Sequence, residues 1–302
     1  MGGPKVLILV AVIICAAMVP STAIAESTKT VRYGPFTVPA AVDGKPAMLE
    51  KLRLGVKKPC IGCYITSFSA SLTYPDGSVA NFNTDAMLHH FVLTNQFRKD
   101  ATCGNSWLGL AGERFFASGN ERTAITLPNG YGYRVHWYDS WNALVEIMNM
   151  KPAQQTFYID VTFTYRHPWE NVRRVRPVWL DIDQCRDSQY PIPAGESQAT
   201  WDWNVNVEGA VVAAAGHVHD HGVQIEATNL NTGQSICKSM AGYGSDPAYM
   251  GHLESMSFCS GDPLALVDAG HVVQLRSTYN SPEAADDVMG IMLAYVHPRA
   301  VP

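Results

Sequence analysis

Basic residues are scarce in this sequence. It has 22 lysines and arginines against 27 aspartates and glutamates, which gives a formal net charge of -5 at pH 7 over 302 residues. Proteins that bind nucleic acid or an anionic membrane surface through charge carry an excess of basic residues, often gathered in patches. The shortage of basic residues therefore argues against both kinds of partner.

Long hydrophobic runs are also missing, apart from one at the N-terminus. There Lys5 precedes the apolar stretch 6–19, and Ala23-Ile24-Ala25 follows it. A positive residue, a short apolar run and an A-x-A motif are typical of a secretory signal peptide. The run is short for a transmembrane helix, which needs about 20 apolar residues. We expect residues 1–25 to be removed, leaving an exported protein without a membrane partner, and the oligomeric state stays open.

Helix signals are few, whereas Val, Thr, Tyr, Phe and Trp are frequent and turn residues recur at short intervals. This composition predicts an all-β protein. The Pro- and Gly-containing segment 190–197 is typical of a linker. We expect two β-sandwich, jelly-roll-like domains in tandem, residues 26–188 and 189–302. A hairpin is expected at the turn 74–78. The expected strands are 66–73, 87–93, 122–127, 133–138, 156–165, 175–182, 205–215, 223–229, 271–278 and 288–296.

Six cysteines remain once the signal segment is removed. They are Cys60, Cys63, Cys103, Cys185, Cys237 and Cys259. An even number of cysteines in an exported chain indicates disulfides, here three. Cys60-x-x-Cys63 also fits a zinc or redox motif, but no second C-x-x-C completes a zinc site. Six cysteines allow about 15 pairings, among which Cys237 with Cys259 is favoured because both lie in the C-terminal half.

Histidine is uncommon, with 10 residues, yet three of them fall within the segment 216–222. If this segment is extended, the side chains of His217 and His219 point to the same face. Two imidazoles at this spacing can bind one metal ion. Asp220 would face the other way. Because these histidines are clustered and follow an apolar stretch, we interpret them as metal ligands rather than as isolated surface residues.

Further candidate ligands lie elsewhere in the chain. His89 and His90 are adjacent in an expected strand, so both reach one metal only at a strand end, twist or bulge. His136 lies in an expected aromatic strand, where a single histidine is more often a core or edge residue. Met289 or Met292 would add a thioether, a soft ligand that favours Cu(I). A methionine in an apolar strand usually fills the core, so the pattern alone leaves its role open.

These residues occur in one order, His89-His90, His136, His217-x-His219 and Asp287-x-Met289. In this order, on an all-β exported chain, the sequence resembles the copper type II, ascorbate-dependent monooxygenases, the family of peptidylglycine α-hydroxylating and dopamine β-monooxygenases. The resemblance extends from about Cys63 to Val296.

The resemblance implies two copper ions per chain, one on each domain, facing each other across a solvent-filled cleft. The ligands of the electron-storing copper would be His89, His90 and His136. The ligands of the catalytic copper, which meets O2, would be His217, His219 and Met289. The choice of Met289 over Met292 rests on the Asp-x-Met resemblance alone.

The implied activity is hydroxylation of an aliphatic C–H bond in a small organic substrate. Substrate, O2, two electrons and two protons give an alcohol and water, with ascorbate as the reductant. The resemblance also implies disulfides from Cys63 to Cys103 and from Cys60 to Cys185.

Two departures from the peptide-amidating members bear on the substrate. The arginine expected two residues before His217 is Ala215, and the tyrosine expected four residues after Met289 is Leu293. Both groups are carboxylate anchors in those members, so we do not expect a C-terminal glycine substrate. His221 has three open roles, as a residue beside the ligands, a competing ligand or an exposed residue, and Asp220 has none assigned.

Other interpretations fit less well. The metallo-β-lactamase motif His-x-His-x-Asp-His is missed by one residue, because Asp220 directly follows His219. A cupin would place a glutamate nearer to His219 than Glu226 is. The absence of a Gly-x-Ser-x-Gly motif argues against the nucleophile elbow of a hydrolase. A non-catalytic, exported copper carrier is the main alternative, because the same ligands serve both roles. The remaining histidines are interpreted as surface or structural residues: His167, His252, His271 and His297.

Overall fold

The computed structural model describes residues 26–104, 112–244 and 246–299, so the expected signal segment 1–25 lies outside the described residues. Regular structure in the described part consists of β-strands and two short 3-10 turns, Phe82–Thr84 and Pro247–Tyr249. The prediction of an all-β protein is therefore confirmed. Among these residues no helix is long and apolar enough to cross a membrane.

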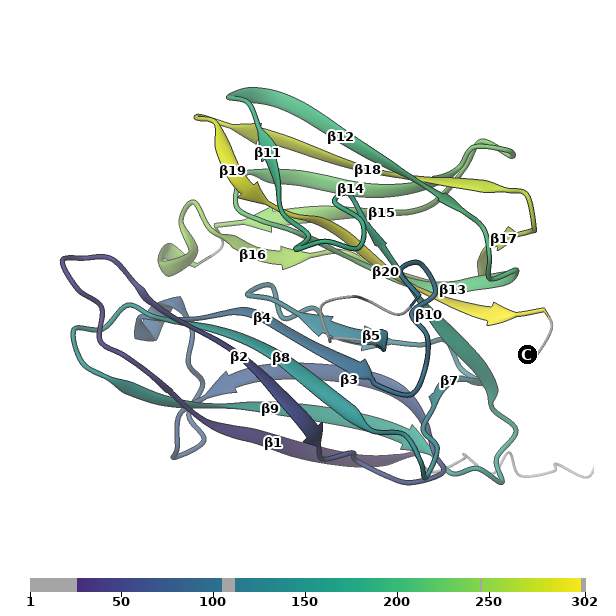
Figure 1. Cartoon of the computed structure of the whole chain (residues 1–302), viewed down its shortest axis with the longest axis horizontal. Helices are drawn as coiled ribbons and strands as arrows, with labels where there is room; N and C mark the ends of the chain where they lie inside the picture. The colour runs from purple at the N-terminus through teal and green to yellow at the C-terminus, as the bar shows by residue number, and fades with distance from the viewer. Residues whose placement is uncertain (1–25, 105–111, 245, 300–302) are drawn as a thin grey trace, which may run out of the picture.

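One nine-stranded sheet runs through both halves of the molecule (Figure 1). Its strand order is β1-β9-β3-β7-β10-β20-β13-β17, and β6 pairs with β3 at the side. Its strands are β1 Ser27–Val38, β3 Tyr64–Thr73, β6 Ile125–Thr126, β7 Tyr131–Arg134, β9 Gln155–Arg166, β10 Arg173–Asp181, β13 Gly209–Val218, β17 Phe258–Val267 and β20 Gly290–Pro298.

Three smaller sheets complete the fold. A four-stranded sheet, β2-β8-β4-β5, packs in the N-terminal half, and a five-stranded sheet, β12-β18-β14-β15-β16, packs in the C-terminal half (Figure 1). β11 and β19 form a two-stranded sheet. Their strands are β2 Ala47–Val56, β4 Ala86–Asn95, β5 Glu113–Ser118, β8 Trp141–Asn149, β11 Tyr190–Ile192, β12 Gly195–Asn204, β14 Gly222–Asn229, β15 Gln234–Tyr243, β16 Leu253–Met256, β18 Val272–Ser281 and β19 Ala285–Val288.

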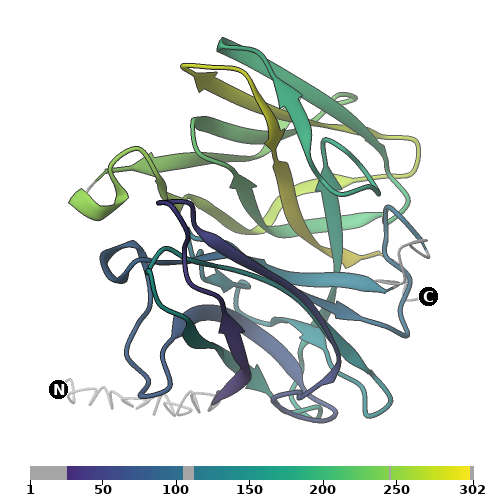
Figure 2. The same cartoon turned by 60° about the vertical axis from the view of Figure 1, so that its left-hand side comes forward.

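The strand β20 is buried on both faces, because it lies between the two halves. Ile291, Leu293 and Tyr295 belong to the core of the N-terminal half, whereas Met292 and Ala294 belong to the core of the C-terminal half. A strand that is covered on both faces has a sequence that is apolar along nearly its whole length. Figure 2, turned from Figure 1, shows the same stacking of the green and yellow half on the purple and blue half.

β10 and β20 show how closely the two halves are joined. β10 lies in the expected first domain, yet it pairs with β20 from Arg176 to Asp181, antiparallel, and with β7 on its other side, parallel. The expected linker 190–197 contains β11 and the start of β12, so it is not irregular along its length. The division into domains at residue 188 stays a prediction.

The expected hairpin at the turn 74–78 forms only as a short one, because its pairing is limited to an isolated antiparallel bridge and its neighbouring backbone hydrogen bonds. The turn itself forms, with the backbone N–H of Gly77 donating to the carbonyl of Tyr74 at 3.0 Å. After an isolated bridge between Thr73 and Val79, the turn Phe82–Thr84 leads the chain to the opposite sheet. There β4 pairs with β5 and β8 instead of β3.

The described residues contain three disulfides, as the cysteine count predicts. They join Cys60 to Cys63, Cys103 to Cys185, and Cys237 to Cys259. The pairing of Cys237 with Cys259 is confirmed, but the two pairings implied by the family resemblance are wrong. The reason is spatial: the hydroxyl of Thr102 donates to the carbonyl of Trp179 at 2.7 Å, which holds the turn before Cys103 against β10, the strand that leads to Cys185.

Candidate metal centre

His89 and His90 lie in β4 at a point where the strand leaves regular pairing. The register with β8 shifts between Leu88 and His90, which marks a β-bulge. The two side chains would face opposite sides of a regular strand, but here both reach one carboxylate. Nδ1 of His89 lies 2.9 Å, and Nδ1 of His90 2.7 Å, from Oε2 of Glu146. A bulge is one of the strand irregularities that the sequence analysis requires for both histidines to bind one metal.

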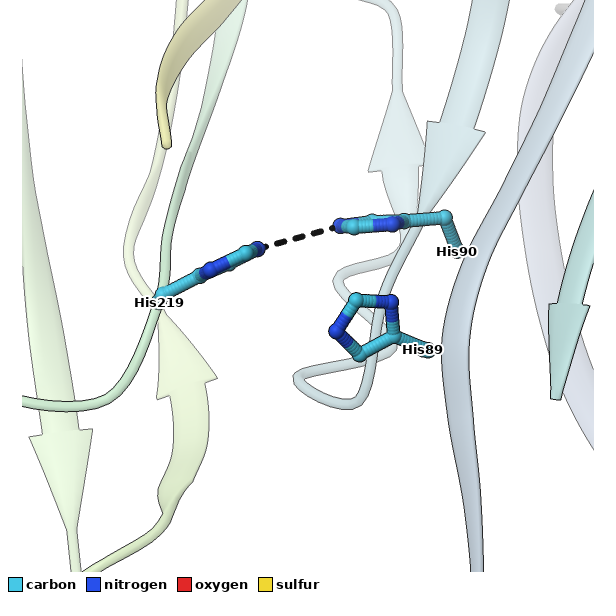
Figure 3. Close-up of side chains that lie close together, drawn as sticks. All are labelled: His89, His90 and His219. Atoms are coloured by element: carbon cyan, nitrogen blue, oxygen red, sulfur yellow. Dashed lines mark hydrogen bonds between the residues drawn. The ribbon is translucent and has the colours of Figure 1, made fainter. Parts of the chain in front are cut away.

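His217 and His219 approach from the end of β13, in the other half of the molecule. Nε2 of His217 lies 3.2 Å, and Nε2 of His219 3.3 Å, from Nε2 of His90. Both side chains therefore point to the same side, as their spacing predicts. Figure 3 shows His219 facing His90 and His89 from the opposite segment. A Cβ at Gly119 would lie 3.0 Å from Cε1 of His217, so glycine leaves room for this imidazole.

The ring nitrogens of these residues converge. His89, His90 and His219 each offer one nitrogen, and the three atoms lie within 4.8 Å of one another. Two nitrogens that bind one metal at about 2.0 Å with a tetrahedral angle lie about 3.3 Å apart. The distances from His90 to His217 and His219 agree with this value. We call these four residues, His89, His90, His217 and His219, the histidine cluster.

Two carboxylates beside the histidines determine which ring nitrogens carry protons. Glu146 contacts Nδ1 of His90, and Oε1 of Glu121 lies 3.0 Å from Nδ1 of His217. A carboxylate accepts a hydrogen bond, so each Nδ1 carries the proton and each Nε2 keeps a lone pair. The Nε2 lone pairs of His90 and His217 then face each other, an arrangement that a cation between them stabilises. Carboxylates in this position are usual behind metal-binding histidines, so the residues fit a metal ion.

The pKa values support neutral imidazoles at His90 and His219, beside the anionic carboxylates of Glu146 and Glu121. Burial lowers the pKa of His90 to about 4 and holds that of His219 well below its ordinary value. Burial acts to raise the pKa of Glu146, but its hydrogen bonds from the imidazoles lower it overall. Burial likewise opposes ionisation of Glu121 and His217, but their mutual attraction lowers the pKa of Glu121 and raises that of His217. A metal cation requires neutral imidazoles, so metal binding at His217 would release the proton that Glu121 stabilises there.

Met289 lies beside the histidine cluster, and His136 lies apart from it. Met289 is buried and lines a cavity with His90 and His217, whereas Met292 packs in the core of the C-terminal half. β7 ends at Arg134, so the expected strand 133–138 is wrong at its end and His136 lies in the turn that follows.

Two cavities border the histidine cluster. The smaller, of about 90 Å³, adjoins His90 and His217 and is mostly apolar. The larger, of about 330 Å³, adjoins His89 and His219. Other side chains that line the larger cavity are Phe82, Met87, Met148, Met150, Asp220, His221, His252, Leu253 and Asp287. Its volume is sufficient for a small organic molecule.

Asp220 and His252 form a pair at the wall of the larger cavity. Oδ2 of Asp220 lies 2.6 Å from Nδ1 of His252, and Oδ1 accepts the backbone N–H of Leu253 at 2.7 Å. The ring of His252 stacks on Phe82 with their centroids 4.4 Å apart. His252 is therefore placed beside the site, although the sequence indicated only a surface or structural role. His221 lines the same cavity and has a φ of 69°.

Residues 116–298 match the family described as Stress up-regulated Nod 19. This segment is more than half of the chain and includes His136, His217, His219 and Met289. The chain belongs to the Stress up-regulated Nod 19 family. The match gives this family rather than the ascorbate-dependent monooxygenases that the sequence resembles, and membership of the latter stays a prediction.

Two fungal relatives of this Stress up-regulated Nod 19 chain are similar over most of its length. It is 28% identical over 290 residues to "Probable copper-dependent oxygenase M1" of Phoma sp., covering 90% of this chain and 72% of the relative. It is 28% identical over 247 residues to "Probable copper-dependent oxygenase clz3" of Cochliobolus lunatus, covering 76% and 77% respectively. Among solved structures, the major capsid protein P2 from bacteriophage PM2 covers 91% of this chain and 98% of its own chain, with a TM-score of 0.38 and 8% identity. That likeness is too weak to support an argument.

The sequence did not indicate Glu146 and Glu121. Glu146 is the single charged residue of β8, a strand that is mostly apolar and was not among the expected strands. Its position between a buried valine and a buried isoleucine is the one feature of the sequence that could have indicated a role in the site. Glu121 follows β5 in a short turn and carries no signal of its own, because its contact with His217 spans 96 residues of sequence.

Proposed function

We propose that this chain is an exported, copper-dependent oxygenase whose metal is bound by the histidine cluster. The observation that carries the proposal is the convergence of imidazole nitrogens from both halves of the molecule, held by Glu146 and Glu121. Imidazole suits copper, zinc, iron and nickel. The names of the two fungal relatives favour copper and oxygenase chemistry among these.

The number of metal ions is the point on which the family resemblance and the contacts differ. The resemblance predicts two copper ions, bound by histidines on separate domains. The direct approach of His217 and His219 to His90 favours one ion shared by both histidine pairs. We propose the shared ion, with two ions per chain as the alternative that a copper count distinguishes.

The proposed reaction is hydroxylation of an aliphatic C–H bond with O2 and an ascorbate-type reductant. Copper supplies one-electron redox chemistry and O2 activation when it is bound. Glu146 and Glu121 orient the imidazoles, which keeps the Nε2 atoms directed at the metal position. The apolar lining beside His90, His217 and Met289 limits the access of water to that position.

The larger cavity is the proposed substrate site. Met87 and Met148 offer apolar surface there, and the pair of Asp220 and His252 offers hydrogen-bonding groups at the wall. A mostly apolar cavity with a few polar groups is typical of small-molecule sites. The proposed substrate is therefore a small organic molecule with an apolar body and a polar substituent.

The test is reductant-driven O2 consumption by the purified chain without residues 1–25. Copper-loaded protein with ascorbate should consume O2 faster than metal-free protein, and His217→Ala should reduce this copper-dependent rate to that of the metal-free protein. His167→Ala is the matched control, because His167 stacks on Trp169 instead of joining the cluster, and it should behave as wild type.

Copper binding without O2 consumption, under conditions that keep the copper reduced, would contradict the oxygenase and support a carrier. Preference for zinc over copper in competition would contradict the copper centre itself. Because a carrier and an oxygenase bind copper alike, the O2 measurement and the copper count have to be made on the same preparation.

A further inference from the structure

Another cavity, of about 240 Å³, lies outside the histidine cluster and is surrounded by basic side chains. It is lined by five basic residues and one carboxylate, and His136 and Tyr138 also lie on its wall. The charged residues are Arg98, Lys99, Glu113, Arg134, Arg174 and Arg176. We call this cavity the basic pocket.

Strand pairing gathers these residues from separate parts of the chain. Arg174 and Arg176 are two residues apart on β10, so they project from the same face. β10 pairs in parallel with β7, which ends at Arg134. From the turn after β4, Arg98 donates to the backbone carbonyl of Arg134 at 2.7 Å. The pocket is thus a product of the fold rather than of one flexible surface loop.

The basic charge exceeds the acidic charge around the pocket. Arg98 contacts Asp139 at 2.6 Å and Glu113 at 3.5 Å, and Arg176 lies 3.9 Å from Glu113. Nε of Arg134 is buried and has no hydrogen-bond partner among the described residues. Its guanidinium instead lies 4.5 Å from the ring centroid of Tyr64.

This arrangement is unexpected in a chain with a net charge of -5. The four arginines are half-buried, and holding like charges together away from water costs free energy unless an opposite charge is present. Guanidinium groups bind carboxylate and phosphate with two parallel hydrogen bonds. We propose that the basic pocket binds a small anion that carries carboxylate or phosphate groups.

His136 belongs to this pocket in the proposal. Burial lowers its pKa, and the charge of Arg98 acts in the same direction, so the ring is neutral at pH 7. Lys58 holds the surrounding turn by donating to the carbonyls of His136 and Asp139 at 3.1 and 2.6 Å. The neighbouring arginines repel a metal cation and attract an anion. His136 is thereby assigned to anion recognition rather than to a copper site.

The experiment is a calorimetric titration of the metal-free chain, without residues 1–25, with inorganic phosphate at constant ionic strength. Oxalate and citrate are the carboxylate arms, and chloride is the non-specific reference. Saturable binding of one phosphate or carboxylate anion per chain is expected. Arg134→Gln should weaken it about tenfold, the usual effect of losing a charged hydrogen bond. Lys99→Gln, an exposed change that leaves the interior intact, should weaken it less.

Lys29→Gln on β1 is the matched control, because it removes the same charge from an exposed residue that does not line the pocket. It should bind as wild type, and the His136 ring resonances should shift on addition of phosphate in both proteins. No saturable binding in any arm, or equal weakening by Lys29→Gln and Arg134→Gln, would overturn the proposal. The titration uses no copper, so its failure is distinguishable from failure of the proposed oxygenase.

Discussion

The histidine cluster and the basic pocket each contain part of the predicted ligand set, and they differ in the charges that surround the histidines. Behind His90 and His217 stand the carboxylates Glu146 and Glu121. Around His136 the arginines outnumber the carboxylates Glu113 and Asp139, and Asp139 accepts the backbone N–H of His136 instead of a ring N–H. Carboxylate neighbours stabilise a cation at the ring nitrogens, whereas guanidinium neighbours repel it. The comparison shows that residues from distant strands decide whether a histidine can bind a metal.

The largest expected difference between the two regions is in copper binding. His90→Ala should abolish retention of copper after dialysis, because His90 contacts both His217 and His219. His136→Ala should retain the copper content of wild type. Copper per chain, measured by elemental analysis, checks both variants. Loss of copper in His136→Ala would show that His136 is a ligand and would contradict the difference between the two regions.

The next effect concerns the carboxylates. Glu146→Gln and Glu121→Gln should each weaken copper binding by about 10–100-fold, the usual result of removing a group that orients a metal-binding histidine. Glu146→Gln should have the larger effect, since Glu146 contacts two imidazoles and Glu121 one. Competition against a copper chelator measures the affinities. Wild-type affinity in Glu146→Gln would show that the carboxylate does not orient the site.

A smaller effect is expected in the stability of the metal-free protein at acid pH. The pKa of His90 is lowered from 6.5 to about 4 in the folded chain by burial. As the pH falls, the unfolded chain therefore binds this proton first, so stability present above pH 6.5 is lost between pH 6.5 and 4. The loss is at most about 3–4 kcal/mol at about 1.4 kcal/mol per pKa unit. Denaturant unfolding at pH 7 and 4.5 should show a smaller decrease for His90→Gln, and equal decreases would contradict the burial argument.

The smallest expected effect is on Cu(I) binding, and it distinguishes Met289 from Met292. Met289→Ile should weaken binding of Cu(I) by severalfold, because Met289 lines the cavity beside His90 and His217. Met292→Ile should leave copper binding unchanged and destabilise the fold by about 1 kcal/mol, since it repacks a filled core. Cu(I) competition and denaturant unfolding separate these outcomes. The reverse pattern would assign the thioether role to Met292.

Local patterns were sufficient for much of the fold and for half of the site. Strand-favouring residues between recurring turn residues identified strands such as β3, β9 and β14, and the two-residue spacing identified His217 and His219 as neighbours on one face. The sequence also gave the condition under which His89 and His90 could bind one metal, a strand end, twist or bulge, but it did not indicate which of these forms. These features depend on a few consecutive residues, and for this reason they can be predicted from the sequence.

The other half of the site depends on pairing between distant strands. Glu146 reaches the histidines through the register of β8 with β4, and β8 itself was not expected. The end of β7 at Arg134 removed His136 from its expected strand. The disulfide pairings failed for the same reason, because the approach of the turn before Cys103 to β10 is a tertiary contact. No local pattern specifies such contacts.

The most direct test of the account is the copper count of the protein without residues 1–25 and of two variants, one from each half, His90→Ala and His217→Ala. The account predicts one copper per chain in the wild type and close to none in both variants, because a single ion is shared across the two halves. Two coppers in the wild type, with each variant keeping one, would contradict the shared centre and support two separate sites.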